Sequence, residues 1–171
     1  MTLLAITVLG HDRPGIIAGT TGVLAELGLN IEDSTMTLLR GHFAMTLITD
    51  GDSDAATVEA SLAGLTADGS LSVSVREVPA EDVVSRGSAY LLSVHGGDRP
   101  GIVSSVVAQI ADVGGNITDL TTRLAGDLYV LIAEVDLPAS ADPVALQRSL
   151  ESVAAELGVD VTLRPLESDD L

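Results

Sequence analysis

Two copies of one pentapeptide contain the residues best suited to chemistry. Asp12-Arg13-Pro14-Gly15-Ile16 returns as Asp98-Arg99-Pro100-Gly101-Ile102, an offset of 86 residues (98 − 12). Each copy follows a short apolar run and precedes apolar residues at helical spacing, which predicts a tight loop at a helix start. The first N–H groups of a helix are unpaired and carry partial positive charge. Because glycine lets a ligand approach the backbone, each loop is a candidate site for a carboxylate or a phosphate.

The same offset relates further residues after each loop. The matched pairs are Gly28 and Gly114, Asn30 and Asn116, Ile31 and Ile117, Asp33 and Asp119, and Thr35 and Thr121. This indicates a duplication, and its period is too long for a solenoid. We therefore expect a first domain at 1–79, a linker at 80–88, a second domain at 89–166 and an acidic tail at 167–171. Domains this small bury a modest fraction of their surface, so we expect them to pack against each other or against a second chain. Of these arrangements a homodimer is the one we expect.

Hydrophobic periodicity predicts the same order of elements in both halves. The first half reads as a strand at 2–9, a helix from Pro14 to Gly28, a strand at 29–39 with a bulge near 33–34, a strand at 43–49, a helix at 55–65 and a strand at 71–78. The second half reads as 89–94, 100–113, 116–124, 128–135, 143–157 and 159–164. The order βαββαβ predicts an α+β, ferredoxin-like fold: a four-stranded antiparallel sheet with two helices on one face. Asp12 is placed either to cap the first helix or to complement the positive end of its dipole.

The composition excludes several functions. The formal net charge is −17, and all eight basic residues are arginine, so a phosphate backbone would repel the chain and direct nucleic-acid binding is not expected. Without lysine there is neither a Walker A lysine nor a Schiff base, and without cysteine there is neither a disulfide nor a thiolate. No apolar run approaches a membrane span and no signal peptide is recognised, so we expect no membrane partner and a cytoplasmic location. The negative charge either maintains solubility or meets a basic patch on a protein partner.

The side chains beside the loops have open alternatives. His11 either contacts a ligand, acts as a pH switch, or is only locally paired. Arg13 and Arg99 either clamp a carboxylate or pair with a neighbouring acid. Asn30 and Asn116 are expected near the other end of the first helix of each half. Their reach to the loop of their own domain is left open, and they could reach a loop across an interface. The histidines share no metal-ligand spacing and no reactive constellation is present, so we expect no metal, no cofactor and no enzyme activity.

The loop, the helix that ends at glycine and the Asn-Ile that follows resemble the ACT domain, a βαββαβ regulatory module that typically binds amino acids. The resemblance covers both halves, and two such domains without a catalytic domain resemble the glycine cleavage system transcriptional repressor family. In ACT domains the effector lies against the loop at an interface between domains. Carried over, this implicates His11, Asp12, Arg13, Pro14, Gly15, Ile16, Asn30 and Ile31, with Gly97, Asp98, Arg99, Pro100, Gly101, Ile102, Asn116 and Ile117.

The resemblance also implies partners. It favours a small amino acid effector, with glycine or serine first, and a regulatory protein partner in place of direct DNA contact. His11 is replaced by Gly97 in the second copy, so the two sites cannot be chemically equal. The alternative is an interaction and assembly module without a ligand, in which the glycine only makes a tight turn and the aspartate only caps a helix.

Overall fold

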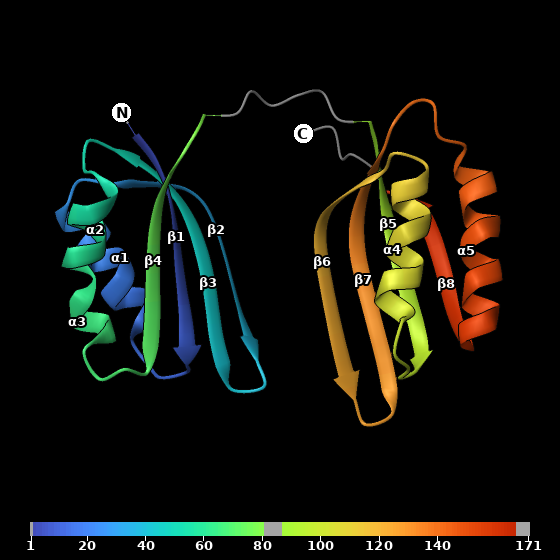
Figure 1. Cartoon of the computed structure of the whole chain (residues 1–171), viewed down its shortest axis with the longest axis horizontal. Coiled ribbons are helices and arrows are strands. Elements are labelled where there is room, and N and C mark those ends of the chain that lie inside the picture. The colour runs from blue at the N-terminus through green and yellow to red at the C-terminus, as the bar shows by residue number, and fades with distance from the viewer. Residues whose placement is uncertain (1, 81–86, 167–171) are drawn as a thin grey trace. The chain divides into compact units, whose positions relative to one another are not determined.

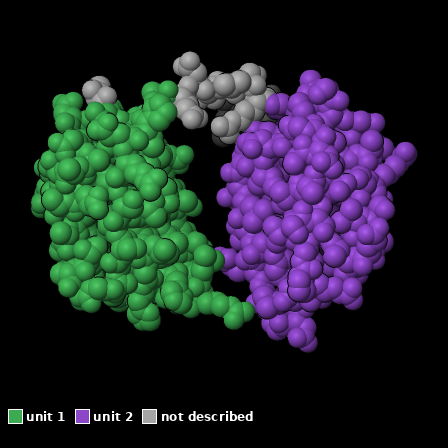
Figure 2. Space-filling view, in the orientation of Figure 1, with its two compact units in different colours: residues 1–82 green, residues 83–171 purple. Residues whose placement is uncertain are grey.

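A computed structural model describes residues 2–80 and 87–166 of the chain. The chain divides into two compact units, residues 1–82 (unit 1) and 83–171 (unit 2), which Figure 2 colours separately. Most of the predicted linker 80–88 lies outside the described residues, as does the predicted tail 167–171, and Ser88 already belongs to a strand. No helix among the described residues is both long enough and apolar enough to cross a membrane.

Unit 1 is a four-stranded antiparallel sheet with its helices on one face (Figure 1). Its elements are β1 (Thr2–His11), α1 (Ile16–Glu26), β2 (Asn30–Leu39), β3 (His42–Gly51), α2 (Ala55–Ser61), α3 (Ala63–Thr66) and β4 (Leu71–Val78). The strand order is β2-β3-β1-β4, so β1 pairs with both β3 and β4. The first strand of the unit therefore lies inside the sheet and delivers the loop that follows it to the start of α1.

Unit 2 repeats this arrangement. Its elements are β5 (Ser88–Gly97), α4 (Ile102–Asp112), β6 (Asn116–Ala125), β7 (Leu128–Leu137), α5 (Pro143–Leu157) and β8 (Val159–Pro165). The strand order β6-β7-β5-β8 matches that of unit 1 position by position. The predicted fold class, two ferredoxin-like α+β domains, is confirmed.

The core of each unit lies between the sheet and its helices. In β1 the alternating residues Leu4, Ile6 and Val8 are fully buried beneath the helices, whereas Thr7 is exposed on the opposite, open face of the sheet. Unit 2 has the same alternation, with Leu92 buried in β5. The alternation is what a sheet covered on one face requires.

Two core positions differ in polarity between the units. Thr20 and Thr49 are fully buried in unit 1, and the same offset of 86 places Val106 and Val135 in unit 2. The Thr20 hydroxyl donates to the Ile16 carbonyl at 2.8 Å. The Thr49 hydroxyl, in contrast, has no hydrogen-bond partner among the described residues. Unit 1 thus buries a polar group without compensation at a position where unit 2 is apolar.

Several predicted boundaries need correction. The helices begin at Ile16 and Ile102, so Pro14 and Pro100 lie in the loops before them. β1 continues to His11, two residues beyond the predicted end, because it keeps pairing with β3 as far as His42. β5 likewise ends at Gly97, three residues beyond the predicted end, and β7 ends at Leu137, two residues beyond it. The irregularity in β2 falls between Ile31 and Asp33 instead of at 33–34.

The helix predicted at 55–65 is two short helices. The fully buried Leu62 (φ −84°, ψ −3°) lies between them, as the C-cap of α2 and the N-cap of α3. Gly64 follows directly, and glycine is a poor helix former. In unit 2, by contrast, α5 runs over the predicted range 143–157 without a break.

Candidate functional site

The helix starts after the two pentapeptides have the same unusual backbone. Gly15 precedes α1 with φ 90° and ψ 0°, and Gly101 precedes α4 with φ 94° and ψ −6°. A side chain at Gly15 would meet no atom within 4 Å, so space does not demand glycine there. The backbone conformation does, since residues with a Cβ adopt this region only with strain.

No described residue caps either of these helix starts with its side chain. Of the two roles predicted for Asp12, capping the first helix is therefore wrong, because Gly15 occupies the cap position. The second helix of each unit shows the contrast. Asp54 accepts a hydrogen bond from the Thr57 N–H at 2.7 Å, which lowers the pKa of its carboxyl, and Asp142 accepts from the Val144 N–H at 2.9 Å. The first-turn N–H groups of α1 and α4 are left available for an outside acceptor.

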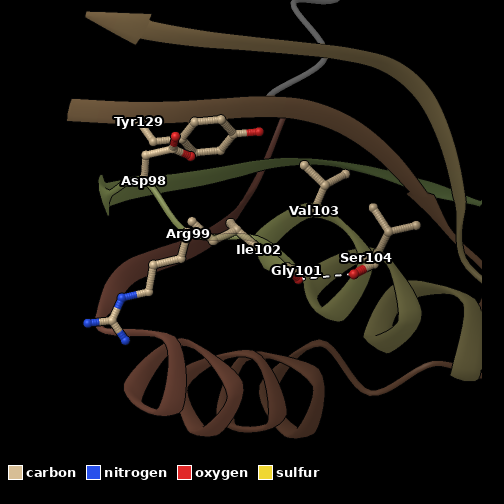
Figure 3. A pocket seen from close by; sticks show the side chains of 8 residues that line it. Asp98, Arg99, Gly101, Ile102, Val103, Ser104 and Tyr129 are labelled. Atoms are coloured by element: carbon tan, nitrogen blue, oxygen red, sulfur yellow. Dashed lines mark hydrogen bonds between the residues drawn. The ribbon is translucent and has the colours of Figure 1, made fainter. Parts of the chain in front are cut away.

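A groove lies at each of the two uncapped helix starts. Groove 1, of about 480 Å³, is lined by Asp12, Arg13, Gly15, Ile16, Ile17, Ala18, Met36 and Phe43. Groove 2, of about 410 Å³, is lined by Asp98, Arg99, Gly101, Ile102, Val103, Ser104, Val107 and Tyr129, most of which are labelled in Figure 3. Seven of the eight positions correspond at the offset of 86 residues, so the duplicated loop forms the same groove twice.

The walls of the two grooves differ. Groove 1 has Ala18 and Phe43 where groove 2 has Ser104 and Tyr129. Figure 3 shows the Ser104 hydroxyl bonded to the Gly101 carbonyl, a contact of 3.1 Å. Each groove also has an aspartate at its loop, Asp12 or Asp98. An uncapped helix start beside a carboxylate offers one positive and one negative partner within a few residues.

Arg13 is committed to the structure of unit 1. Its guanidinium donates to the Leu65 carbonyl at 2.9 Å and to the Ser70 hydroxyl at 3.1 Å, and it forms an ion pair with Asp68. Hydrogen bonds from the Ser70 hydroxyl and from the Ser70 N–H, together with Arg13, lower the pKa of the Asp68 carboxyl to about 2. Of the two alternatives for this arginine, pairing with a neighbouring acid is the one that the structure shows.

Arg99 has no such partners. Its side chain makes no hydrogen bond or ion pair within residues 2–80 and 87–166, and Figure 3 shows it extending away from the other lining side chains. The guanidinium lies over Gly158, the residue that ends α5, where an added Cβ would stand 3.6–3.8 Å from its atoms. Its charge is thus placed at the negative end of α5.

The remaining predicted site residues do not line the grooves. These are His11, Pro14, Asn30 and Ile31, with Gly97, Pro100, Asn116 and Ile117. Asn30 follows the far end of α1, and eleven helical residues separate the two ends by about 16 Å. Asn30 is instead the cross-strand partner of Asp50. A ligand role for these residues stays a prediction.

The sequence reasoning missed the second half of each groove wall. Phe43 and Tyr129 come from the strand after the hairpin turn, and Ile17 and Val103 come from the first turn of the helix. A signal was present for Phe43, because it shares the alternation that buries Met45 and Leu47 beneath the helices. Which strand lies beside which loop depends on strand order, and local patterns do not reveal strand order.

A family model described as ACT domain matches residues 2–76 and 88–164. The chain belongs to the ACT domain family. Each matched segment spans one unit up to the end residues of its last strand, so the chain is a tandem pair of ACT domains.

Two curated proteins are similar to this chain in sequence. A UPF0237 protein of Methanopyrus kandleri is 54% identical over 50 residues, which are 29% of this chain and 56% of that protein. The glycine cleavage system transcriptional repressor of Escherichia coli (strain K12) is 28% identical over 162 residues, covering 90% of this chain and 85% of the repressor. The tandem ACT protein is thus related to that repressor along nearly its whole length.

Solved structures agree on the fold. A structure described as an unknown protein from Galdieria sulphuraria has a TM-score of 0.81 and 29% identity, covering 97% of this chain and 99% of that one. A structure described as a putative glycine cleavage system transcriptional repressor has a TM-score of 0.69 at 18% identity, with 98% of each chain covered. At that identity the second likeness supports the ACT fold alone.

Proposed function

We propose that this tandem ACT protein binds a small free amino acid at the start of α1 or α4 and regulates a protein partner in response. The observation that carries the proposal is the pair of uncapped helix starts, each opening into a groove with an aspartate at its loop. The same arrangement in both units is more than a single tight turn requires.

The chemistry suits a zwitterion. The ligand carboxylate would accept hydrogen bonds from the first-turn N–H groups of the helix, where the dipole is positive. Its ammonium group would lie beside the carboxylate of Asp12 or Asp98. The apolar wall of the groove would take a short side chain, and for this reason small amino acids such as glycine or serine are preferred.

The protein partner is inferred from charge and relationship. The related Escherichia coli protein is named a transcriptional repressor, whereas a net charge of −17 disfavours direct contact with DNA. Regulation through a protein partner fits both facts. That the chain acts as a homodimer is a further part of the proposal. Binding transmits a signal only if the amino acid has a different affinity for two arrangements of the protein. The second candidate, an assembly module without a ligand, predicts no response to any amino acid.

The test introduces a glutamate at each helix start, so that its carboxylate takes the place proposed for the carboxylate of the ligand. Ala18→Glu and Ser104→Glu place a negative charge at the two exposed helix starts, where each stabilises its helix by about 0.3–1 kcal/mol. The double variant should keep or raise its melting temperature and lose amino acid binding at least tenfold. Ala25→Glu and Ala111→Glu, exposed at the other ends of the same helices, are the matched controls and should retain binding.

The readout is a thermal-shift screen of the full chain against all twenty amino acids, followed by calorimetry. Saturation at about 100 times the dissociation constant stabilises by roughly 2.7 kcal/mol, which such a screen detects. The proposal fails if no amino acid shifts the wild-type transition at millimolar concentration. It also fails if both glutamate variants bind as well as their controls. Substitution of Gly15 is less informative, because its backbone at φ 90° makes any side chain destabilising.

A further inference from the structure

The fold brings His11 and His42 together although 30 residues separate them in the sequence. The register of β1 and β3 makes them direct cross-strand partners, at the last position of β1 and the first of β3. Direct partners share one face of a sheet, with Cβ atoms about 4.5–5.5 Å apart. Both side chains are exposed. They share the open face of the sheet with Leu9 and Thr7, away from the helices.

The two imidazoles are available as ligands. Nδ1 of His42 lies 3.3 Å from the Arg40 carbonyl, and when Nδ1–H donates there the Nε2 lone pair is left for a metal. The His11 side chain has no hydrogen bond or ion pair with any residue in 2–80 or 87–166, while its backbone N–H donates to the Ser70 carbonyl at 2.9 Å. His95, in contrast, lies 3.6 Å from Asp160.

We propose that His11 and His42 chelate one divalent transition-metal ion of the imidazole-preferring class, Ni²⁺, Cu²⁺ or Zn²⁺. Imidazole suits these ions, and their affinity rises towards copper. No group of three or more His, Cys, Asp or Glu side chains that could hold a metal was found among the described residues. The pair is therefore a two-ligand surface chelate, with water or another molecule in the remaining positions. The net charge of −17 raises the local concentration of cations.

The site would act on groove 1 through the chain that joins them. Asp12 follows His11 directly, lines groove 1, and donates its N–H to the Gly41 carbonyl at 3.1 Å. A metal held by His11 and His42 would tie the end of β1 to the start of β3 at the base of this loop. Unit 2 has Gly97 opposite Leu128 at the equivalent positions and lacks both ligands. The inference is thus specific to unit 1 and independent of the proposed amino acid ligand.

The first test is calorimetric titration of the full wild-type chain with Ni²⁺ in a buffer that does not bind metals. We expect one ion per chain. His11→Ala and His42→Ala should each weaken binding at least tenfold, whereas His95→Ala should leave it unchanged. His42→Gln, which keeps a side chain of similar length, repeats the test should His42→Ala disturb the strand. Cu²⁺ electron paramagnetic resonance should show two imidazole nitrogens on the ion.

The second test builds the pair where it is absent. Gly97 has open space around its Cβ position and a backbone that any residue adopts, and Leu128 is 48% exposed, so Gly97→His with Leu128→His fits unit 2 without clashes. This variant should bind two Ni²⁺ ions per chain. The proposal is overturned if the wild type binds no ion at millimolar Ni²⁺, or if binding survives in the variant lacking both His11 and His42. A rebuilt pair that binds no second ion would equally contradict it.

Discussion

Gly15 and Gly101 have nearly the same backbone angles, whereas the arginines two residues before them have different surroundings. Arg13 is fixed by Leu65, Asp68 and Ser70, and Arg99 lies over the end of α5 without a hydrogen bond among the described residues. The helix start is thus the same in both units although its arginine is held differently. This teaches that the backbone of the loop, and not the arginine, sets the groove. Arg13 supports the segment that leads to β4, whereas Arg99 lies at the end of α5.

The first prediction tests the backbone, which should have the largest effect. Gly15→Ala and Gly101→Ala should each lower the stability of their own unit by about 1–3 kcal/mol, because a Cβ is strained at φ near 90°. The two costs should be equal, since the angles are. Amide exchange of α1 and α4 in the full chain measures each unit separately. Unequal costs would mean that the two helix starts are not equivalent.

The second prediction exchanges the two side chains, Thr49 and Val135, at one buried position that differs between the units. Thr49→Val should stabilise unit 1 by about 1–2 kcal/mol, because it removes a buried hydroxyl that has no partner among the described residues. Val135→Thr should destabilise unit 2 by a similar amount. Urea unfolding of both variants against the wild type measures the change. A destabilised Thr49→Val variant would show that the hydroxyl has a partner in solution.

The third prediction separates the two arginines. Arg13→Gln should destabilise unit 1 by about 0.5–1 kcal/mol, since it removes three contacts to the α3–β4 connection. Arg99→Gln should change stability by less. Exchange of amides in residues 65–71 should quicken only in the first variant. Equal effects of the two substitutions would contradict the contrast between the units.

The fourth and smallest effect depends on pH. Folding lowers the pKa of Asp68 from 3.8 to about 2, so its carboxylate contributes stability that is fully present above about pH 4. The contribution is lost as the pH falls through about 2. Asp68→Asn should therefore differ from the wild type at pH 6 and converge with it near pH 2. Arg99 has no such carboxylate partner among the described residues, so the stability of unit 2 should show no corresponding change with pH. A stability difference between Asp68→Asn and the wild type that persists below pH 2 would contradict an origin in the Asp68 carboxylate.

The sequence predicted well those helices and strands whose ends are set by residues close to them in the sequence. β4 at 71–78 follows from strict alternation, and α5 at 143–157 follows from apolar residues at helical spacing. The glycines that end the first helices were also read correctly. Gly28 has φ 71°, and the N–H groups of Gly28 and Leu29 close the helix on Ala25 and Leu24 at 3.0 Å.

What failed depends on partners distant in sequence or on angles that a sequence does not display. Pro14 fits either a first helical turn or the loop before it, and only the left-handed backbone of Gly15 decides between them. The pairing of His11 with His42 is set by strand register, so the spacing rule for metal ligands could not detect it. The loop residues that line each groove were among the predicted site residues, because the loop is local. The lining residues from the first helix and from the hairpin strands were not.

The interior position of β1 also determines when the first sheet can form during synthesis on the ribosome. β1 needs both β3 and β4 as partners, so the first sheet cannot close until Val78 has been synthesised. At about 5–20 residues per second, the synthesis from His11 to Val78 takes roughly 3–13 s. During that wait no strand of the second copy exists, which spares β1 from mispairing with strands that resemble its own partners. The order of synthesis therefore protects a duplicated protein from exchanging strands between its copies.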